Sequence, residues 1–192
     1  MNIRQRKLAY DSLLTKRPLS SINLLVIHCT ELPDLESARE YGKKVLYNSG
    51  TGNSGHFYID RDGQTEQWIS LERVAHHVQG HNQNSIGIEL VNKGRYPHWY
   101  HSDHQVTTEP YSDSQINALI KLINYLTGQL PNLKHIVGHE DLDQRQVPSD
   151  NDRSITVPRK IDPGPLFPWQ NVMQNTHLIN IGAHAKNYDK SK

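Results

Sequence analysis

The stretch "NLLVIHCT", residues 23–30, decides the fold of this chain. Four aliphatic residues in succession, bounded by polar ones, predict a buried β-strand over Leu24–His28. Cys29, the only cysteine of the chain, follows directly. Adjacent side chains on a strand point to opposite faces, so we expect Cys29 to be a small core residue that shares no site with His28. His28 itself is either a core histidine or a functional group at a strand end.

Three further segments have the pattern of strands. The stretch "SIGIELV", residues 85–91, is apolar apart from one carboxylate, Glu89, and predicts a second buried strand. In "HFYIDRDGQTEQWIS", alternating residues on both sides of the turn Arg61–Gly63 predict a hairpin. The stretch "LKHIVGHEDL" predicts a short strand that ends near His139.

Helical spacing is clearest after residue 111. Ser112 and Gln115 form a capping-box pattern, and Gly128 is expected to end the helix. A surface helix is predicted in "PDLESAREYGKKVLYNS", with Asp34 or Ser37 as its cap. The apolar stripe predicted to pack against the sheet consists of Ile116, Leu119, Ile120, Ile123 and Leu126. These elements predict an α/β fold: a single domain with a mixed central β-sheet flanked by α-helices.

Composition limits the functions that need to be considered. The chain has 192 residues, 35% of them hydrophobic, which is enough for one core without disulfides. No apolar run could span a bilayer, so we expect no transmembrane segment, and the first residues lack the apolar centre of a signal peptide. The formal net charge of +1 gives no electrostatic reason to expect nucleic acid as the main partner.

Two histidines and an aspartate could form a metal site. His28 ends a strand, His139 follows "IVG", and Asp162 lies in the proline-flanked stretch "RKIDPGPLFPW". Two histidines and one carboxylate are a ligand set of catalytic zinc, with the fourth position open to water. Their spacing alone is a weak signal, because the chain has twelve histidines.

Glu89 and Lys160 strengthen the case for a hydrolytic site. A lone anion inside an apolar strand is costly, so Glu89 is expected to be paired, metal-linked or used for acid–base chemistry. Lys160 lies two residues before Asp162 and could stabilise a developing oxyanion. The alternative interpretation is a structural Glu89–Lys160 ion pair.

Five motifs in order now resemble a known family. They are "LLVIHCT", "SGHFYIDRDG", "AHHVQGHNQNSIGIEL", "IVGHEDL" and "RKIDPGPLFPW", between Leu24 and Trp169. Together they resemble the zinc-dependent N-acetylmuramoyl-L-alanine amidases of the AmpD-like type, relatives of phage T7 lysozyme and of the peptidoglycan recognition proteins. The resemblance implies hydrolysis of the amide between N-acetylmuramic acid and L-alanine in peptidoglycan or muropeptides, for cell-wall turnover or recycling.

The resemblance also assigns roles to residues. It implies that His28, His139 and Asp162 bind one Zn²⁺ per chain, that Glu89 is the acid–base group, and that Lys160 is catalytic. It further implies a catalytic domain over residues 21–173, between an N-terminal arm (1–20) and a C-terminal tail (174–192) for which we predict no chemistry. We expect a monomer.

Weaker positions follow from the same motifs. His56 and His77 are expected to line the substrate cleft rather than to bind metal. Phage relatives carry a tyrosine where this chain has Gly55, which argues against a tyrosine-assisted mechanism and favours Glu89. The usual tryptophan before His77 is replaced by His76, so this wall of the cleft is expected to bind sugar differently.

Other functions and sites stay open at this point. The chain could be a peptidoglycan-binding module without activity, or a zinc hydrolase of another amide. Its motifs favour the periplasm or cell envelope, whereas the missing signal peptide favours the cytoplasm. His98, His101 and His104 recur at three-residue intervals, which is typical of a solvated loop but also allows a second metal site.

Overall fold

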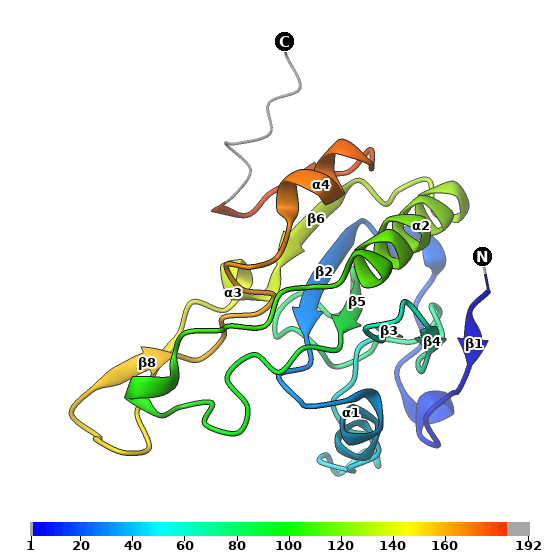
Figure 1. Cartoon of the computed structure of the whole chain (residues 1–192). Helices are drawn as coiled ribbons and strands as arrows, with labels where there is room; N and C mark the ends of the chain where they lie inside the picture. The colour runs from blue at the N-terminus through cyan, green and yellow to red at the C-terminus, as the bar shows by residue number, and fades with distance from the viewer. Residues whose placement is uncertain (1, 184–192) are drawn as a thin grey trace.

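A central β-sheet organises the chain, and residues 2–183 are described by the computed structural model (Figure 1). The strands are β1 (Arg4–Gln5), β2 (Leu24–Cys29), β3 (Phe57–Ile59), β4 (Thr65–Gln67), β5 (Ser85–Leu90), β6 (His135–Gly138), β7 (Gln146–Pro148), β8 (Thr156–Pro158) and β9 (Ile179–Asn180). Seven of them form one sheet in the order β1-β4-β3-β5-β2-β6-β9, and β7 pairs with β8. In the large sheet only β3 and β4 are antiparallel, so the sheet is mixed, as predicted.

Helices cover the sheet and connect its strands. The α-helices are α1 (Leu35–Gly42), α2 (Asp113–Gln129), α3 (His139–Leu142) and α4 (Trp169–Gln174), and the short 3₁₀ turns are η1 (Asp11–Leu13), η2 (Leu19–Ser21) and η3 (Ser102–His104). Helix α2 crosses one face of the sheet (Figure 1). Its buried stripe packs with Leu25 and Ile27 of β2 in the main core. Within residues 2–183, no helix combines the length and the apolar character that crossing a membrane requires.

The alternation of β2 separates its two faces. Leu25 and Ile27 face α2, whereas Leu24 and Val26 pack on the opposite face with Val78 and Val137. By the same alternation, His28 lies on the face away from α2 and Cys29 points toward it. Cys29 is buried and unpaired, in agreement with its predicted core position.

The three central strands are parallel and end at one edge of the sheet. β2 lies between β5 and β6, with His28 beside Glu89 and Ile27 beside Gly138. Because His139 directly follows Gly138, the carboxyl ends of the three strands bring two histidines and a carboxylate to one place. The carboxyl edge of parallel strands is where ligands usually bind in open α/β sheets.

Both ends of the chain extend the sheet beyond the limits of 21–173 that we expected for the domain. In the N-terminal arm, β1 pairs with β4, and Leu8, Tyr10 and Leu14 are buried in a second core cluster. In the C-terminal tail, β9 pairs with β6. Such two-residue strands are too short to show alternation, so the sequence gives no signal for them. Residues 184–192 of the tail lie outside the described residues.

The helix ends differ from the prediction in two places. Asp34 caps α1 as expected, accepting a hydrogen bond from the Ser37 N–H at 2.7 Å, but the helix ends at Gly42. Ser112 likewise caps α2 by accepting from the Gln115 N–H at 3.1 Å. Gly128 does not stop α2, which runs through Gln129. A glycine ends a helix by adopting a left-handed conformation, and Gly128 has no positive φ.

Candidate active site

A cleft of about 670 Å³ opens at the carboxyl ends of β2, β5 and β6. His28, Glu89 and His139 line its floor. Tyr41 and Tyr47, from the end of α1 and the loop after it, give the lining aromatic surface. The lining also includes the cationic side chains of Lys44, Arg145, Arg159 and Lys160. Lys44 Nζ lies 3.7 Å from the centroid of the Tyr41 ring, so aromatic and positively charged groups are mixed in the lining.

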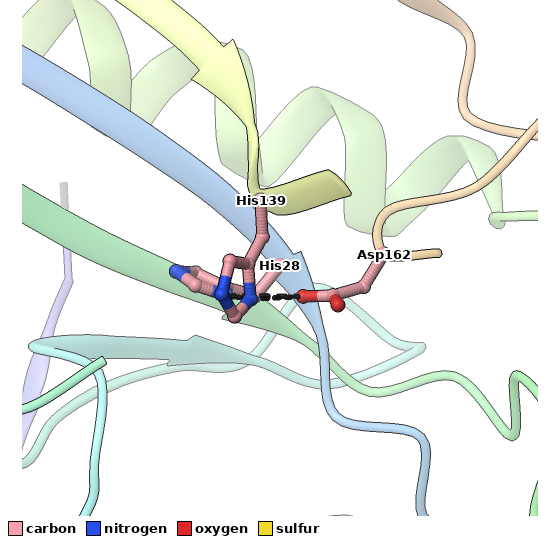
Figure 2. A group of neighbouring side chains, drawn as sticks. All are labelled: His28, His139 and Asp162. Atoms are coloured by element: carbon pink, nitrogen blue, oxygen red, sulfur yellow. Dashed lines mark hydrogen bonds and ion pairs between the residues drawn. The ribbon is translucent and has the colours of Figure 1, made fainter. Parts of the chain in front are cut away.

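The three predicted ligand residues meet on the cleft floor (Figure 2). His28 Nδ1 lies 2.9 Å from His139 Nδ1 and 3.0 Å from Asp162 Oδ2, and His139 Nδ1 lies 3.0 Å from the same oxygen. All three side chains are buried. Their ligand atoms form a nearly equilateral triangle, although the residues come from a strand end, a helix start and a loop.

The protonation states of His28 and Asp162 are those a divalent cation needs. Burial and the neighbouring His139 lower the pKa of His28 to about 4, so its ring is neutral at pH 7. Burial alone would raise the pKa of Asp162, but His139 and Lys160 hold it well below its usual value. A neutral imidazole and an ionised carboxylate can bind metal without first losing a proton.

The donor set fits zinc. Ligand atoms of a tetrahedral zinc ion lie about 3.3 Å apart for bonds of about 2.0–2.1 Å, and the observed separations of 2.9–3.0 Å are close to that value. Asp162 Oδ2 faces both histidines, while its buried Oδ1 accepts no hydrogen bond from the described residues. Within residues 2–183, only His28, His139 and Asp162 gather in this way. An open fourth position would face the cleft.

The backbone around Asp162 is fixed by neighbours. The N–H of Glu140, in the first turn of α3, donates to the Asp162 carbonyl oxygen at 2.9 Å. The Tyr111 hydroxyl donates to the Pro163 carbonyl oxygen at 2.7 Å. One contact thus links the segment of His139 directly to the segment of Asp162, which sets the separation of the two ligands.

His77 supports the site from behind. Its Nδ1 lies 3.0 Å from His28 Nε2, and its Nε2 lies 3.1 Å from Ser85 Oγ. Ser85 Oγ in turn donates to the His81 carbonyl oxygen at 2.7 Å. If His28 Nδ1 is a ligand, its Nε2–H donates to His77, whose own Nε2–H donates to Ser85. This chain fixes the ring of His28, a role that the sequence interpretation of His77 missed.

Glu89 lies beside the ligand triangle without a hydrogen bond to it. Its Oε1 is 3.9 Å from His28 Nδ1, and 15% of its side chain is exposed, toward the cleft. Burial, with the nearby charge of Asp162, raises the pKa of Glu89 to about 8. A carboxyl group with a pKa near neutrality can both accept and donate a proton.

Lys160 lines the same cleft and lies beside Asp162. Its Nζ lies 3.9 Å from Asp162 Oδ1, and 28% of its side chain is exposed. Burial lowers the pKa of Lys160, but the carboxylates of Asp162 and Glu31 outweigh that effect and raise it, so the amine is protonated. Glu89 and Lys160 form no ion pair within 4.0 Å, so the alternative interpretation of a structural pair is wrong.

His56 lies beneath the cleft, so the expected contact with substrate is wrong for this residue. It is 0% exposed, and its Nδ1 accepts a hydrogen bond from the Gly87 N–H at 3.1 Å. Arg17 Nη2 lies 2.8 Å from its other ring nitrogen. His56 therefore holds β5 and the N-terminal arm together. His77 and His76, by contrast, do line the cleft.

Gly55 leaves the space that Glu89 occupies. A Cβ atom at position 55 would lie 2.8 Å from Glu89 Cγ and 3.2 Å from the Gly87 carbonyl oxygen. A tyrosine at this position would displace Glu89 from the cleft. The glycine and the glutamate therefore fit each other.

The three loop histidines do not form a second centre of this kind. The ring centroids of His98 and His104 lie 4.6 Å apart in a stacked arrangement, and His101 lies 4.7 Å from His104. In addition, His101 Nδ1 already accepts a hydrogen bond from the Asp103 N–H at 3.3 Å. These histidines are not among the grouped ligand atoms of residues 2–183.

Comparison with known proteins finds amidases among the relatives of this chain. The 1,6-anhydro-N-acetylmuramyl-L-alanine amidase AmpD of Enterobacter cloacae is 32% identical over 120 residues, which are 58% of this chain and 50% of the relative. The N-acetylmuramoyl-L-alanine amidase AmiD of Escherichia coli is 38% identical over 93 residues, 48% of this chain and 28% of the relative. The matches thus span half or less of the length of these two relatives.

A solved structure shares the fold. It is AmiD from Escherichia coli in complex with the substrate anhydro-N-acetylmuramic acid-L-Ala-D-gamma-Glu-L-Lys, with a TM-score of 0.60 and 27% identity over 83% of this chain and 58% of that chain. The sequence pattern of one family matches residues 18–165, most of the chain and all of the cleft floor. On this match, the chain belongs to the N-acetylmuramoyl-L-alanine amidase family.

Proposed function

We propose that this protein is a zinc-dependent amidase that cleaves the bond between N-acetylmuramic acid and L-alanine in peptidoglycan or its fragments. The observation that carries the proposal is the buried triangle of His28, His139 and Asp162, with Glu89 and Lys160 on either side of it in one cleft. Membership of the amidase family and the muropeptide bound in the AmiD structure support the substrate class.

Each residue then has one task. When bound by the triangle, zinc would acidify a water molecule and polarise the carbonyl of the scissile amide. Glu89 takes the proton from the attacking water and later gives it to the leaving amine of L-alanine, for which its raised pKa is suited. Lys160 stays protonated and donates to the oxygen that gains negative charge. His77 holds the ring of His28 and touches no reacting atom.

The cleft walls suit the two halves of a muropeptide. The Tyr47 ring offers a surface for the sugar. Arg145 and Arg159 share one ion-pair partner, Asp143, and so leave a net positive charge for peptide carboxylates. We propose the periplasm or cell envelope as the location, with the cytoplasm as the alternative. Comparing turnover of intact sacculi with turnover of soluble 1,6-anhydro-muropeptides tests which substrate, and hence which compartment, applies.

Two single variants separate metal binding from proton transfer. Asp162→Ala is expected to lose zinc and amidase activity together, because it removes one of three ligands. Glu89→Ala is expected to retain zinc and lose about 10²–10⁴-fold in kcat, the usual range for an acid–base group. Zinc content by elemental analysis and turnover are measured on the same preparations. Normal turnover of Glu89→Ala would reject its assigned role, and metal-free muropeptide binding by the unmodified protein would favour a recognition module.

A further inference from the structure

A buried ion pair lies just behind the catalytic cleft. Glu31 comes three residues after His28 and is the one non-glycine residue with a positive φ among residues 2–183, at 48°. Arg95 comes six residues after Glu89. The side chains of Glu31 and Arg95 are 8% and 1% exposed, and neither lines the cleft.

The guanidinium group of Arg95 has a partner for all five of its N–H donors. Two of them bind the Glu31 carboxylate in a fork, Nε to Oε1 at 2.7 Å and Nη2 to Oε2 at 2.9 Å. Two others reach carbonyl oxygens, from Nη1 to Pro158 at 2.8 Å and from Nη2 to Arg159 at 3.2 Å. The fifth binds the Gln105 side chain at 3.0 Å.

The two carbonyls belong to the residues directly before Lys160. The pair therefore joins three segments. They are the residues just after β2, the strand of His28; the loop just after β5, the strand of Glu89; and the stretch that carries Lys160 and Asp162. A further hydrogen bond holds Glu31 in place: the indole N–H of Trp99 donates to the Glu31 backbone carbonyl oxygen at 3.0 Å.

Neighbouring residues pack tightly around the Glu31 side chain. A Cβ atom on Gly94 would lie 2.7 Å from Glu31 Cγ, and Gly94 itself has a φ of 52°. A buried ion pair is a weak source of stability, because desolvating two charges offsets most of their attraction. What this pair supplies is geometry: a planar fork that fixes two carbonyls relative to a strand end.

We infer that Glu31 and Arg95 are a positioning pair that sets the place of Lys160 over the cleft by holding the backbone at residues 158 and 159. The inference rests on the proposed amidase function, in which Lys160 stabilises developing charge. A small displacement of such a group lowers kcat strongly, because the interaction is made in the transition state. Neither residue of the pair touches substrate or metal.

The test replaces the planar guanidinium group of Arg95 with an amine that keeps the positive charge. Arg95→Lys retains a cation beside Glu31 but cannot reach both carbonyls in one plane. We expect kcat on a soluble muropeptide to fall about 10–100-fold, with KM changed less than about threefold and full zinc content. Glu31→Gln, which keeps some hydrogen bonds to Arg95, is expected to show a smaller fall of the same kind, and it remains informative if Arg95→Lys does not fold.

A matched control exists in the same chain. Arg61 binds Glu109 in a similar but more exposed fork, Nε to Oε1 at 2.5 Å and Nη2 to Oε2 at 3.1 Å. Its Nη1 donates to the Pro33 carbonyl at 2.8 Å, and neither Arg61 nor Glu109 lines the cleft or contacts Lys160. Arg61→Lys is expected to keep kcat within about twofold.

The outcomes are distinguishable. Folded, zinc-loaded Arg95→Lys and Glu31→Gln with unchanged kcat would overturn this inference alone. A fall no larger than that of Arg61→Lys, or a loss of zinc in step with kcat, would also overturn it, because either result indicates a general structural role. Absence of amidase activity in the unmodified protein would instead reject the proposed function.

Discussion

At the scale of single residues, the proposed site depends on a carboxyl group held in an unfavourable environment. Glu89 stands in a row across three strands, beside His28 on one side and Tyr58 on the other. Among residues 2–183 it has no hydrogen-bond partner that would offset its burial. Such a group lowers the stability of the metal-free protein in exchange for a pKa useful in proton transfer.

Because burial of the Glu89 carboxylate lowers stability, Glu89→Gln is expected to stabilise the metal-free protein by an amount that depends on pH. Because the pKa of Glu89 rises from 4.5 in the unfolded chain to about 8 in the folded one, ionisation disfavours folding as pH rises through this window. We expect Glu89→Gln to raise the free energy of unfolding by about 1–3 kcal/mol at pH 8.5 and by much less at pH 4.5. Urea unfolding of both chelated proteins measures the difference, and an equal effect at both pH values would contradict the assigned pKa.

Gly55 supplies a second prediction at this scale. A methyl group at position 55 would lie 2.8 Å from Glu89 Cγ, so Gly55→Ala must move the carboxylate. We expect kcat to fall at least about tenfold while zinc stays bound. Gly128→Ala is the control, because its added Cβ meets nothing within 4 Å, and it should raise stability by roughly 0.5–1 kcal/mol without changing kcat. Full activity in Gly55→Ala would show that Glu89 tolerates the displacement.

At the scale of elements, the parallel strands decide where chemistry is possible. β2, β5 and β6 end side by side, and each delivers one functional residue at or just past its end. The segment between β4 and β5 then contributes a support: His77 precedes β5 and contacts both a ligand residue and Ser85, the first residue of the strand. Ser85 of β5 thus fixes the orientation of His77, and His77 in turn supports the ring of His28.

Removal of this support should weaken metal binding. His77→Ala takes away the hydrogen-bond acceptor of His28 Nε2, and the hydrogen-bond partners of metal-binding histidines are worth about 10–100-fold in metal affinity. Competition with a chelator of known affinity measures the zinc dissociation constant. His76→Ala is the control, since His76 lines the cleft but has no contact with the ligand residues; equal zinc affinity in the two variants would contradict the chain from His28 to Ser85.

The elements that could be predicted from sequence are those with local signals. β2, β5 and α2 each carry a run or a stripe long enough to show its period, and the caps Asp34 and Ser112 mark helix starts. Two-residue edge strands carry no such period. Gly42, the last residue of α1, allows a close approach to Trp68, because a Cβ there would lie 3.3 Å from the Trp68 ring.

The site was predictable only in part, for a related reason. His28, His139 and Asp162 are far apart in sequence, so their meeting follows from motif order and strand topology rather than from spacing. The motif around His56 indicated a cleft residue, but the fold turns this side chain inward beneath Gly87. The contacts of His77 and of the Glu31–Arg95 pair join segments distant in sequence, and no local pattern indicates them.

At the scale of the whole molecule, the proposed metal site joins segments from the first and last thirds of the chain. The ligand residues belong to β2, the start of α3 and the loop after β8, so an unfolded chain presents no site. Binding to the folded state alone stabilises it by mass action, by roughly 4 kcal/mol at a free concentration of about 1,000 times Kd. We therefore expect zinc to raise the Tm of the chelated protein and to leave the Tm of Asp162→Ala unchanged, as differential scanning calorimetry would show.

The central claim is a metal-dependent cut at one amide bond, and product analysis tests it most directly. Purified N-acetylmuramyl-pentapeptide is incubated with the protein, with a chelator, and with chelator followed by excess zinc, and the products are identified by mass spectrometry. The proposed function predicts free pentapeptide in the first sample, none in the second and recovery in the third. Intact substrate in all three samples, or cleavage within the peptide, would contradict it.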